Sequence, residues 1–243
     1  MPTYRLEVAY DGSGFHGYAS QPGLPTVQGS LEEALFRHTG VVETAVAGRT
    51  DRGVHASGQV VSFTTTDPLD TSAVLRSLNR QMAPAIACAT LTEAADDFHA
   101  RFSATYRAYR YGILNRETPD PFLAATTWHY ATLLDEAAMH DAAQPLVGEH
   151  DFASFCKRSG KPTVRNVHLV TWLRRSDVVE LTIAASSFCH QMVRSIVAAS
   201  VDVGRGKLPP DAIGHILKAC DRDESRGAAP PHGLTLTEVG YPA

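Results

Sequence analysis

The sequence lacks the usual signs of a metal site. Its four cysteines are widely spaced and form no C-x-x-C pair. Its eleven histidines include no H-x-x-x-H or H-E-x-x-H pattern, which would place two ligands on one face of a helix. We therefore expect a protein that works without a metal, has no disulfide framework and keeps its cysteines reduced, as in a cytosol.

Long apolar segments are also missing. No apolar run approaches the ~18 residues of a membrane-spanning helix, and the N-terminus lacks the basic segment and cleavage site of a secretory signal. We therefore expect a cytoplasmic protein with no membrane partner. The chain of 243 residues, 44% of them hydrophobic, can bury a sizeable core as one domain or as two closely joined halves.

Positive charge is scarce overall, since the net charge is −4, and this argues weakly against a nucleic-acid partner. One segment is nevertheless rich in positive charge. Residues 98–116 contain four arginines and no acidic residue. The planar guanidinium group suits bidentate contacts with phosphate, although a run of charge is also typical of a solvated surface with no binding role.

Apolar periodicity outlines the secondary structure. Strands are predicted at residues 4–10, 41–46, 59–63, 104–114, 164–174, 178–184 and 234–241. Helices are predicted from the N-cap Thr26 to Gly40 and at residues 72–80, 135–146, 191–203 and 209–219, with a polar loop at 221–232. Because helices and strands do not alternate strictly, we predict an α+β fold with a mostly antiparallel central sheet flanked by helices, in two halves, 1–105 and 106–243.

Asp51 is the first candidate for chemistry. It lies between Arg49 and Arg52 in the stretch AGRTDRGVHA, residues 47–56. Flanking glycines let the backbone turn tightly and bring the carboxylate close to a ligand, while the guanidinium groups favour its ionised form. Such a carboxylate suits nucleophilic attack or a proton relay. The pattern alone is more typical of a turn aspartate paired with a surface arginine, and without further information we favour that structural role.

Two further candidates lie in the second half. Tyr109 and Tyr111 share a strand face with Arg107, and aromatic residues interleaved with arginine can stack a base while holding the nucleic-acid backbone. The alternative is that both tyrosines belong to the core, and we favour it for Tyr111. Arg194 begins an otherwise apolar helix and needs an anionic partner, for which Asp51 is one candidate.

A series of collinear motifs resembles the TruA-type tRNA pseudouridine synthases over nearly the whole chain. The motifs are YDGSGFHG (10–17), TVQGSL (26–31), AGRTD (47–51) with GVH (53–55), DFHARFSA (97–104), RAYRY (107–111), DFASF (151–155), MVR (192–194) and GLTL (233–236). The resemblance implies isomerisation of uridine to pseudouridine at positions 38, 39 and 40 of the tRNA anticodon stem-loop, without cofactor or metal. It also implies a homodimer, with two similar halves around a central sheet and an active-site cleft between them.

The resemblance also assigns roles to residues. The family's invariant aspartate falls on Asp51, its active-site tyrosine on Tyr109, and the arginine that pairs with the aspartate on Arg194. Arg49 corresponds to the arginine that helps to extrude the target nucleotide. The substrate-binding residues that we predict are Arg49, Arg52, His55, Arg101, Arg107, Tyr109, Arg110 and Leu234. Asp51 could attack C1′, add to C6 of the base or remove a ribose proton, and the sequence does not choose among these.

Three positions depart from the family's pattern. Tyr18-Ala19 replaces the usual Trp-Gln, Met82-Ala83 replaces Leu-Pro, and Arg52 stands where the family has alanine. Arg52 adds a charge that could compete for Asp51.

Two other functions are alternatives to a pseudouridine synthase. One is an RNA-binding paralogue without catalysis, against which the retained catalytic set argues. The other is a nucleoside hydrolase, which would need a second carboxylate near Asp51, such as Asp11 or Asp97 brought in by folding.

Overall fold

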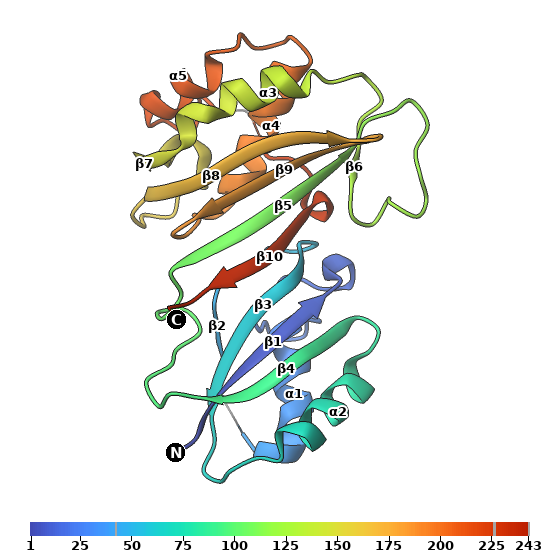
Figure 1. Cartoon of the computed structure of the whole chain (residues 1–243), viewed down its shortest axis with the longest axis vertical. Helices are drawn as coiled ribbons and strands as arrows, with labels where there is room; N and C mark the ends of the chain where they lie inside the picture. The colour runs from blue at the N-terminus through green and yellow to red at the C-terminus, as the bar shows by residue number, and fades with distance from the viewer. Residues whose placement is uncertain (42, 226, 243) are drawn as a thin grey trace. The chain divides into compact units, whose positions relative to one another are not determined.

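The computed structural model describes residues 1–41, 43–225 and 227–242 (Figure 1). The chain divides into two compact units. The first unit comprises Met1–Thr105 and Leu236–Ala243, and the second comprises Tyr106–Thr235. The final residues of the chain therefore fold with the first unit, although the whole second unit precedes them in the sequence.

The first unit is built on a β-sheet, in which the first strand pairs antiparallel with both of its neighbours. Its strands are β1 (Thr3–Tyr10), β3 (His55–Thr64), β4 (Ile86–Ala94) and β10 (Leu234–Gly240), in the order β4-β1-β3-β10. The central strand β1 places Leu6 opposite Val61 of β3 and Leu91 of β4. A short strand, β2 (Ala45–Val46), pairs with β3. The strand predicted at 41–46 is confirmed only for these last two residues, and Val42 lies outside the described residues.

Two helices belong to the first unit. Helix α1 (Val27–Thr39) begins at the predicted N-cap, where Thr26 accepts the backbone N–H of Gly29, and it ends at Gly40 with φ 68°. Helix α2 (Thr71–Met82) is capped by the carboxylate of Asp70 and packs on β4 and α1. Both helices bury an apolar stripe, which consists of Val27, Leu31, Ala34, Leu35, Val74 and Leu78.

The long strands of the second unit pair antiparallel in the order β5-β9-β8-β7. The strands are β5 (Tyr106–Leu114), β7 (Gly148–Asp151), β8 (Val164–Arg175) and β9 (Val178–Ala185), and β6 (Trp128–His129) adds to β5 in parallel. Helices α3 (Glu136–Ala143), α4 (Met192–Gly204) and α5 (Ala212–Ala219) contact one another on one side of this sheet (Figure 1). The predicted α+β class with a mostly antiparallel sheet is confirmed.

Two helix boundaries and one loop differ from prediction. The helix predicted at 135–146 ends at Ala143, because Pro145 lies in a 3-10 turn, Gln144–Leu146. The helix predicted at 209–219 begins only at Ala212, after two prolines. The predicted loop at 221–232 ends in a 3-10 turn, Pro231–Gly233, and Arg226 lies outside the described residues. In the described ranges, no helix is long and apolar enough to cross a membrane.

The expectation that all cysteines stay reduced is wrong for one pair. Cys156 and Cys189 form a disulfide within the second unit, with Cα atoms 5.6 Å apart, while Cys88 and Cys220 are free. The Cα separation is typical of disulfides. The spacing along the chain hid this pair, because 33 residues separate the two cysteines and only the fold brings them together.

Candidate active site

Asp51 lies in the loop between β2 and β3 of the first unit and is half-buried. Main-chain atoms on both sides of it are anchored. The Thr50 carbonyl accepts the N–H of Tyr18 at 3.0 Å, and the Asp51 carbonyl accepts the N–H of Val54 at 3.1 Å. The bond from Val54 to Asp51 closes a tight turn, and Gly53, with φ 77°, provides the left-handed conformation that this turn requires. The carboxylate is thus carried by a loop whose backbone is held in place.

The segment 11–18 packs directly against this loop. A Cβ added to Gly12 would lie 2.1 Å from the carbonyl oxygen of Val54, and one added to Gly17 would lie 3.0 Å from that of Thr50. Gly17 also has φ 96°. Both glycines therefore permit a backbone approach that no side chain allows. This explains physically why the motif at residues 10–17 accompanies the motif that carries Asp51.

His55, predicted to bind substrate, is only 5% exposed. Its Nδ1 accepts the backbone N–H of Gly12 at 3.1 Å and lies 3.2 Å from a carboxylate oxygen of Asp11. The backbone N–H of Ser13 lowers the pKa of Asp11, and His55 contributes to the same shift. The ring therefore holds the segment 11–14 beside the end of the Asp51 loop. An RNA contact by His55 stays a prediction.

The predicted arginines of the first unit are all exposed. Arg49 and Arg52 flank Asp51 on the surface. Arg101 lies in a turn after β4, where its guanidinium carbon is 5.5 Å from the ring centre of Phe102, itself 77% exposed. The ring of His99 lies 4.4 Å from Phe102 on the same turn. An exposed aromatic ring beside an arginine can stack an unpaired base and contact its phosphate.

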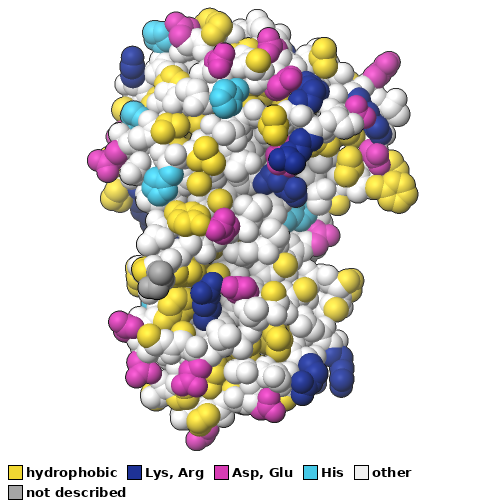
Figure 2. Space-filling view, in the orientation of Figure 1, with side chains coloured by type: hydrophobic (Ala, Val, Ile, Leu, Met, Phe, Trp, Pro, Cys, Tyr) yellow, Lys and Arg dark blue, Asp and Glu magenta, His cyan; other side chains and the backbone are white. Residues whose placement is uncertain are grey.

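Charge of both signs is spread over the surface. On the face drawn in Figure 2, Lys and Arg side chains lie beside Asp and Glu side chains at several places. This agrees with the slightly negative net charge of −4. Any RNA contact must therefore depend on local groups of arginine rather than on the net charge of the chain.

In the second unit, Tyr109 lies on β5 and is 8% exposed. The ring of Phe188 meets it edge-on, with centroids 5.0 Å apart and planes at 86°. Phe188 belongs to the connection between β9 and α4, whose first residue, Ser186, accepts a hydrogen bond from Nη1 of Arg107 at 3.0 Å. Arg107 is buried and holds this connection, so its predicted contact with RNA stays untested.

The neighbouring positions on β5 have different surroundings. Arg110 is exposed and forms an ion pair of 3.4 Å with Glu180 on the adjacent strand β9. Tyr111 is fully buried, and its hydroxyl donates to the carbonyl oxygen of Pro230 at 2.9 Å. Burial raises the pKa of Tyr111 well above its ordinary value. The interpretation of Tyr111 as a core residue is confirmed.

Arg194 is the third residue of α4. Its Nε donates to the carbonyl oxygen of Ala229 at 2.6 Å, and the N–H of Ala229 donates back to the carbonyl of Arg194 at 2.9 Å. Two bonds, one from the guanidinium group and one between main-chain atoms, therefore tie Arg194 to the segment that leads into β10. Leu234, the first residue of β10, is buried at the end of that segment.

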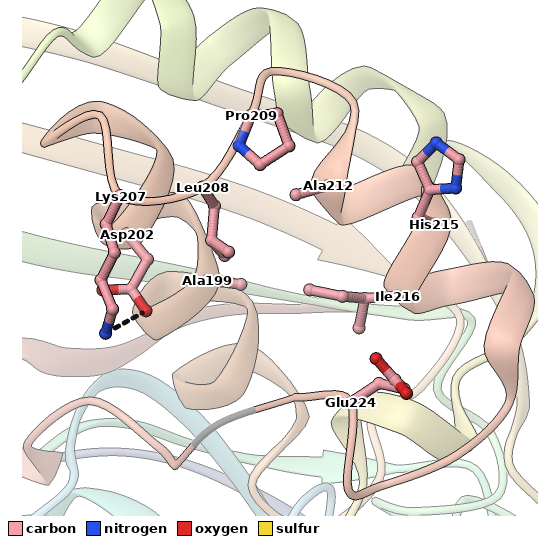
Figure 3. Close-up of a pocket in the computed structure, with 9 residues that line it drawn as sticks. All are labelled: Ala199, Asp202, Lys207, Leu208, Pro209, Ala212, His215, Ile216 and Glu224. Carbon is pink, nitrogen blue, oxygen red and sulfur yellow. Dashed lines mark hydrogen bonds and ion pairs between the residues drawn. The ribbon is translucent and has the colours of Figure 1, made fainter.

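A pocket of about 360 Å³ lies elsewhere in the second unit, beside α4, α5 and the chain that follows α5 (Figure 3). Its apolar wall is formed by Ala199, Leu208, Pro209, Ala212 and Ile216, and its ionisable residues are Asp202, Lys207, His215 and Glu224. Lys207 and Asp202 form an ion pair of 3.4 Å across its edge. None of the residues predicted to act on substrate lines it, so it is separate from the candidate catalytic groups.

Two comparisons with known proteins give the same result. A family model described as tRNA pseudouridine synthase matches residues 7–103 and 142–242. The chain is 43% identical to tRNA pseudouridine synthase A of Streptomyces avermitilis over 250 residues, covering 98% of this chain and 88% of that protein. It is 44% identical over 247 residues to the Frankia casuarinae protein of the same name, covering 98% and 89%. The Brevibacillus brevis protein, also of that name, is 41% identical over 244 residues, covering 99% and 100%.

Proposed function

Given that the chain belongs to the tRNA pseudouridine synthase family, we propose that it isomerises uridine at positions 38, 39 and 40 of the tRNA anticodon arm. The observation that carries the proposal is the position of Asp51 in an anchored loop, within a chain that matches its relatives over almost all of its length. Catalysis requires a reactive group held in place before the substrate arrives, and this loop provides it.

The reaction defines what the side chains must do. The N1–C1′ glycosidic bond breaks, the base rotates, C5 bonds to C1′ and loses its hydrogen as a proton to solvent, and N1 takes up a proton. The target nucleotide must first leave the helix stack, at a cost of roughly a few kcal/mol, which is least in a loop. Asp51 acts as the nucleophile or base, and Arg49 helps to extrude the nucleotide. No cofactor or metal takes part.

Tyr109 and Arg194 complete the proposed catalytic set. Tyr109 stacks on the extruded base and assists proton removal from C5, with its ring orientation supported by Phe188. Arg194 pairs with Asp51 and orients its carboxylate. Its bond to the carbonyl of Ala229 supports this role, because a guanidinium fixed at Nε presents its terminal nitrogens in a defined direction.

The remaining proposals concern partners and location. We propose a cytoplasmic homodimer that binds the anticodon arm through arginine–phosphate contacts. The other predicted substrate contacts are Arg52, His55, Arg107, Arg110 and Leu234. Analytical ultracentrifugation with and without tRNA tests the oligomeric state directly.

Release of tritium from tRNA labelled at C5 of uridine is the decisive test of activity. We expect the purified protein to release tritium from unmodified transcripts with uridine at positions 38–40, with no metal added, because C5 exchanges its hydrogen for C1′. Binding without release would instead favour the non-catalytic paralogue. Release of free uracil would favour the hydrolase, since a synthase keeps the base attached to the ribose.

Arg101→Ala is expected to weaken substrate binding without changing the chemical step. We expect KM for tRNA to rise about tenfold, kcat to stay within about twofold, and the slope of log K against log salt to fall by about one unit for each lost phosphate contact. Steady-state kinetics at several salt concentrations measures all three. Arg37→Ala is the control, because Arg37 is an exposed arginine on α1 outside the predicted contacts. Equal KM values for the two variants would remove Arg101 from the binding surface.

A further inference from the structure

A row of buried polar side chains lies behind the Asp51 loop, in the interior of the first unit. It consists of Gln59 on β3, Tyr10 at the end of β1 and Thr50 in the loop itself. Their exposed fractions are 0%, 4% and 7%. Strands β1 and β3 are neighbours in the sheet, so two adjacent strands present these groups to one loop (Figure 1).

The hydrogen bonds of this row run in one direction. Nε2 of Gln59 donates to the Gly48 carbonyl oxygen at 2.8 Å and to the Tyr10 hydroxyl oxygen at 3.2 Å. Because an amide nitrogen only donates, the Tyr10 oxygen accepts this bond, and its own proton is available to Oγ1 of Thr50, 2.8 Å away. Gly48 and Thr50 are therefore both fixed to the sheet by hydrogen bonds. They lie three residues and one residue before Asp51 in the sequence.

Apolar side chains could fill this interior without a desolvation cost, whereas a buried polar group without a hydrogen-bond partner destabilises the fold. A fully bonded buried network instead selects one backbone geometry. Burial also raises the pKa of Tyr10 to about 12, so its hydroxyl keeps the proton that it donates over the working pH range. The same loop is held from its other side by the N–H of Tyr18 on the Thr50 carbonyl.

We infer that Tyr10 and Gln59 are positioning residues, which set the place of the Asp51 carboxylate by fixing the main chain at Gly48 and Thr50. This inference rests on the proposed role of Asp51 as the catalytic group. Neither residue contacts substrate, and both act through the loop. A displacement of about 1 Å in a catalytic group lowers turnover by roughly 100-fold, so the loss of one anchoring bond reduces kcat rather than binding.

Tyr10→Phe tests the inference by removing one hydroxyl. We expect kcat to fall about 10- to 100-fold while KM for tRNA stays within about twofold. Hydrogen–deuterium exchange of residues 48–52 should become faster, and this readout does not depend on activity. Thr50→Val should reproduce both effects, because it removes the hydroxyl while keeping the shape. Thr50→Ser should restore kcat.

Tyr4→Phe is the matched control. Tyr4 lies on the same strand, is 1% exposed, and its hydroxyl accepts the N–H of Leu69 at 2.8 Å, in the chain before α2. It should lose stability as Tyr10→Phe does, yet keep kcat and the exchange of residues 48–52 unchanged. Equal kcat values for the two variants, measured below both melting temperatures, would overturn the inference, as would unchanged exchange in Tyr10→Phe. An inactive wild-type protein would count against the proposed function, while the exchange measurement still decides the role of Tyr10.

Discussion

Replacing Asp51 with asparagine is expected to abolish pseudouridine formation and to leave tRNA binding nearly unchanged. The amide has the size of the carboxylate but is neither a nucleophile nor a base. We expect tritium release to fall at least ~1,000-fold, equivalent to about 4 kcal/mol of activation free energy. Because phosphate contacts dominate affinity for nucleic acid, the Kd for tRNA should change less than about threefold.

The control for this variant is Asp67→Asn, which makes the same replacement of a carboxylate by an amide at an exposed aspartate of the same unit. It should keep full activity. Activity of Asp51→Asn within about tenfold of wild type, roughly 1.4 kcal/mol, would exclude Asp51 as the nucleophile. A parallel loss of tRNA binding would show instead that the carboxylate organises the binding surface. Filter binding and tritium release on the same protein preparation separate these results.

Gly12→Ala is expected to produce the largest loss of stability among single-methyl additions near the site. The new Cβ would lie 2.1 Å from the main-chain oxygen of Val54, and neither backbone can yield without breaking other bonds. Overpacking of this kind costs about 1–3 kcal/mol, which lowers Tm by roughly 2–12 °C in a chain of this length. Activity should fall as well, because Val54 donates its N–H to the Asp51 carbonyl.

Gly14→Ala separates steric conflict from the general effect of losing a glycine. Both positions lie in the same 3-10 turn, Gly12–Gly14, yet a Cβ at Gly14 has nothing within 4 Å. Thermal denaturation followed by circular dichroism should therefore show nearly wild-type stability for Gly14→Ala. If both variants lose the same Tm, the close approach of Gly12 to the loop is not what stabilises this segment.

Some elements were predictable because the signal is local. Strand β1 alternates regularly between buried and half-buried residues, and α1 carries its own cap in Thr26. Strand β4 was not predicted, because its sequence, IACATLTEA, mixes small and polar residues at an edge of the sheet, where one side has no partner strand. Its position is determined by pairing with β1, which a local pattern does not reveal.

The candidate site divides in the same way. The glycines and arginines around Asp51 are adjacent in the sequence, so the loop could be recognised there. Its supports come from a distance, since Tyr10 and Gln59 are 49 positions apart and share one hydrogen bond. Phe188 reaches Tyr109 from the connection after β9. Gln59, which directly precedes the apolar pair Val60 and Val61 on β3, was a local sign of a buried polar group.

The return of the last strand to the first unit has a consequence for synthesis. Strand β10 follows β3 in the order β4-β1-β3-β10, and a Cβ at Gly58 of β3 would lie 2.2 Å from the carbonyl oxygen of Thr237, so the two strands fit closely. The hydroxyl of Tyr241 also bonds to the carbonyl of Ala100 at 2.7 Å. During synthesis on the ribosome, β3 therefore lacks its pairing with β10 until some 130 residues of the second unit have been added. Strand edges left open in this way are sites of aggregation. Strand β3, which follows the Asp51 loop, thus gains its pairing with β10 only after the whole second unit has been made.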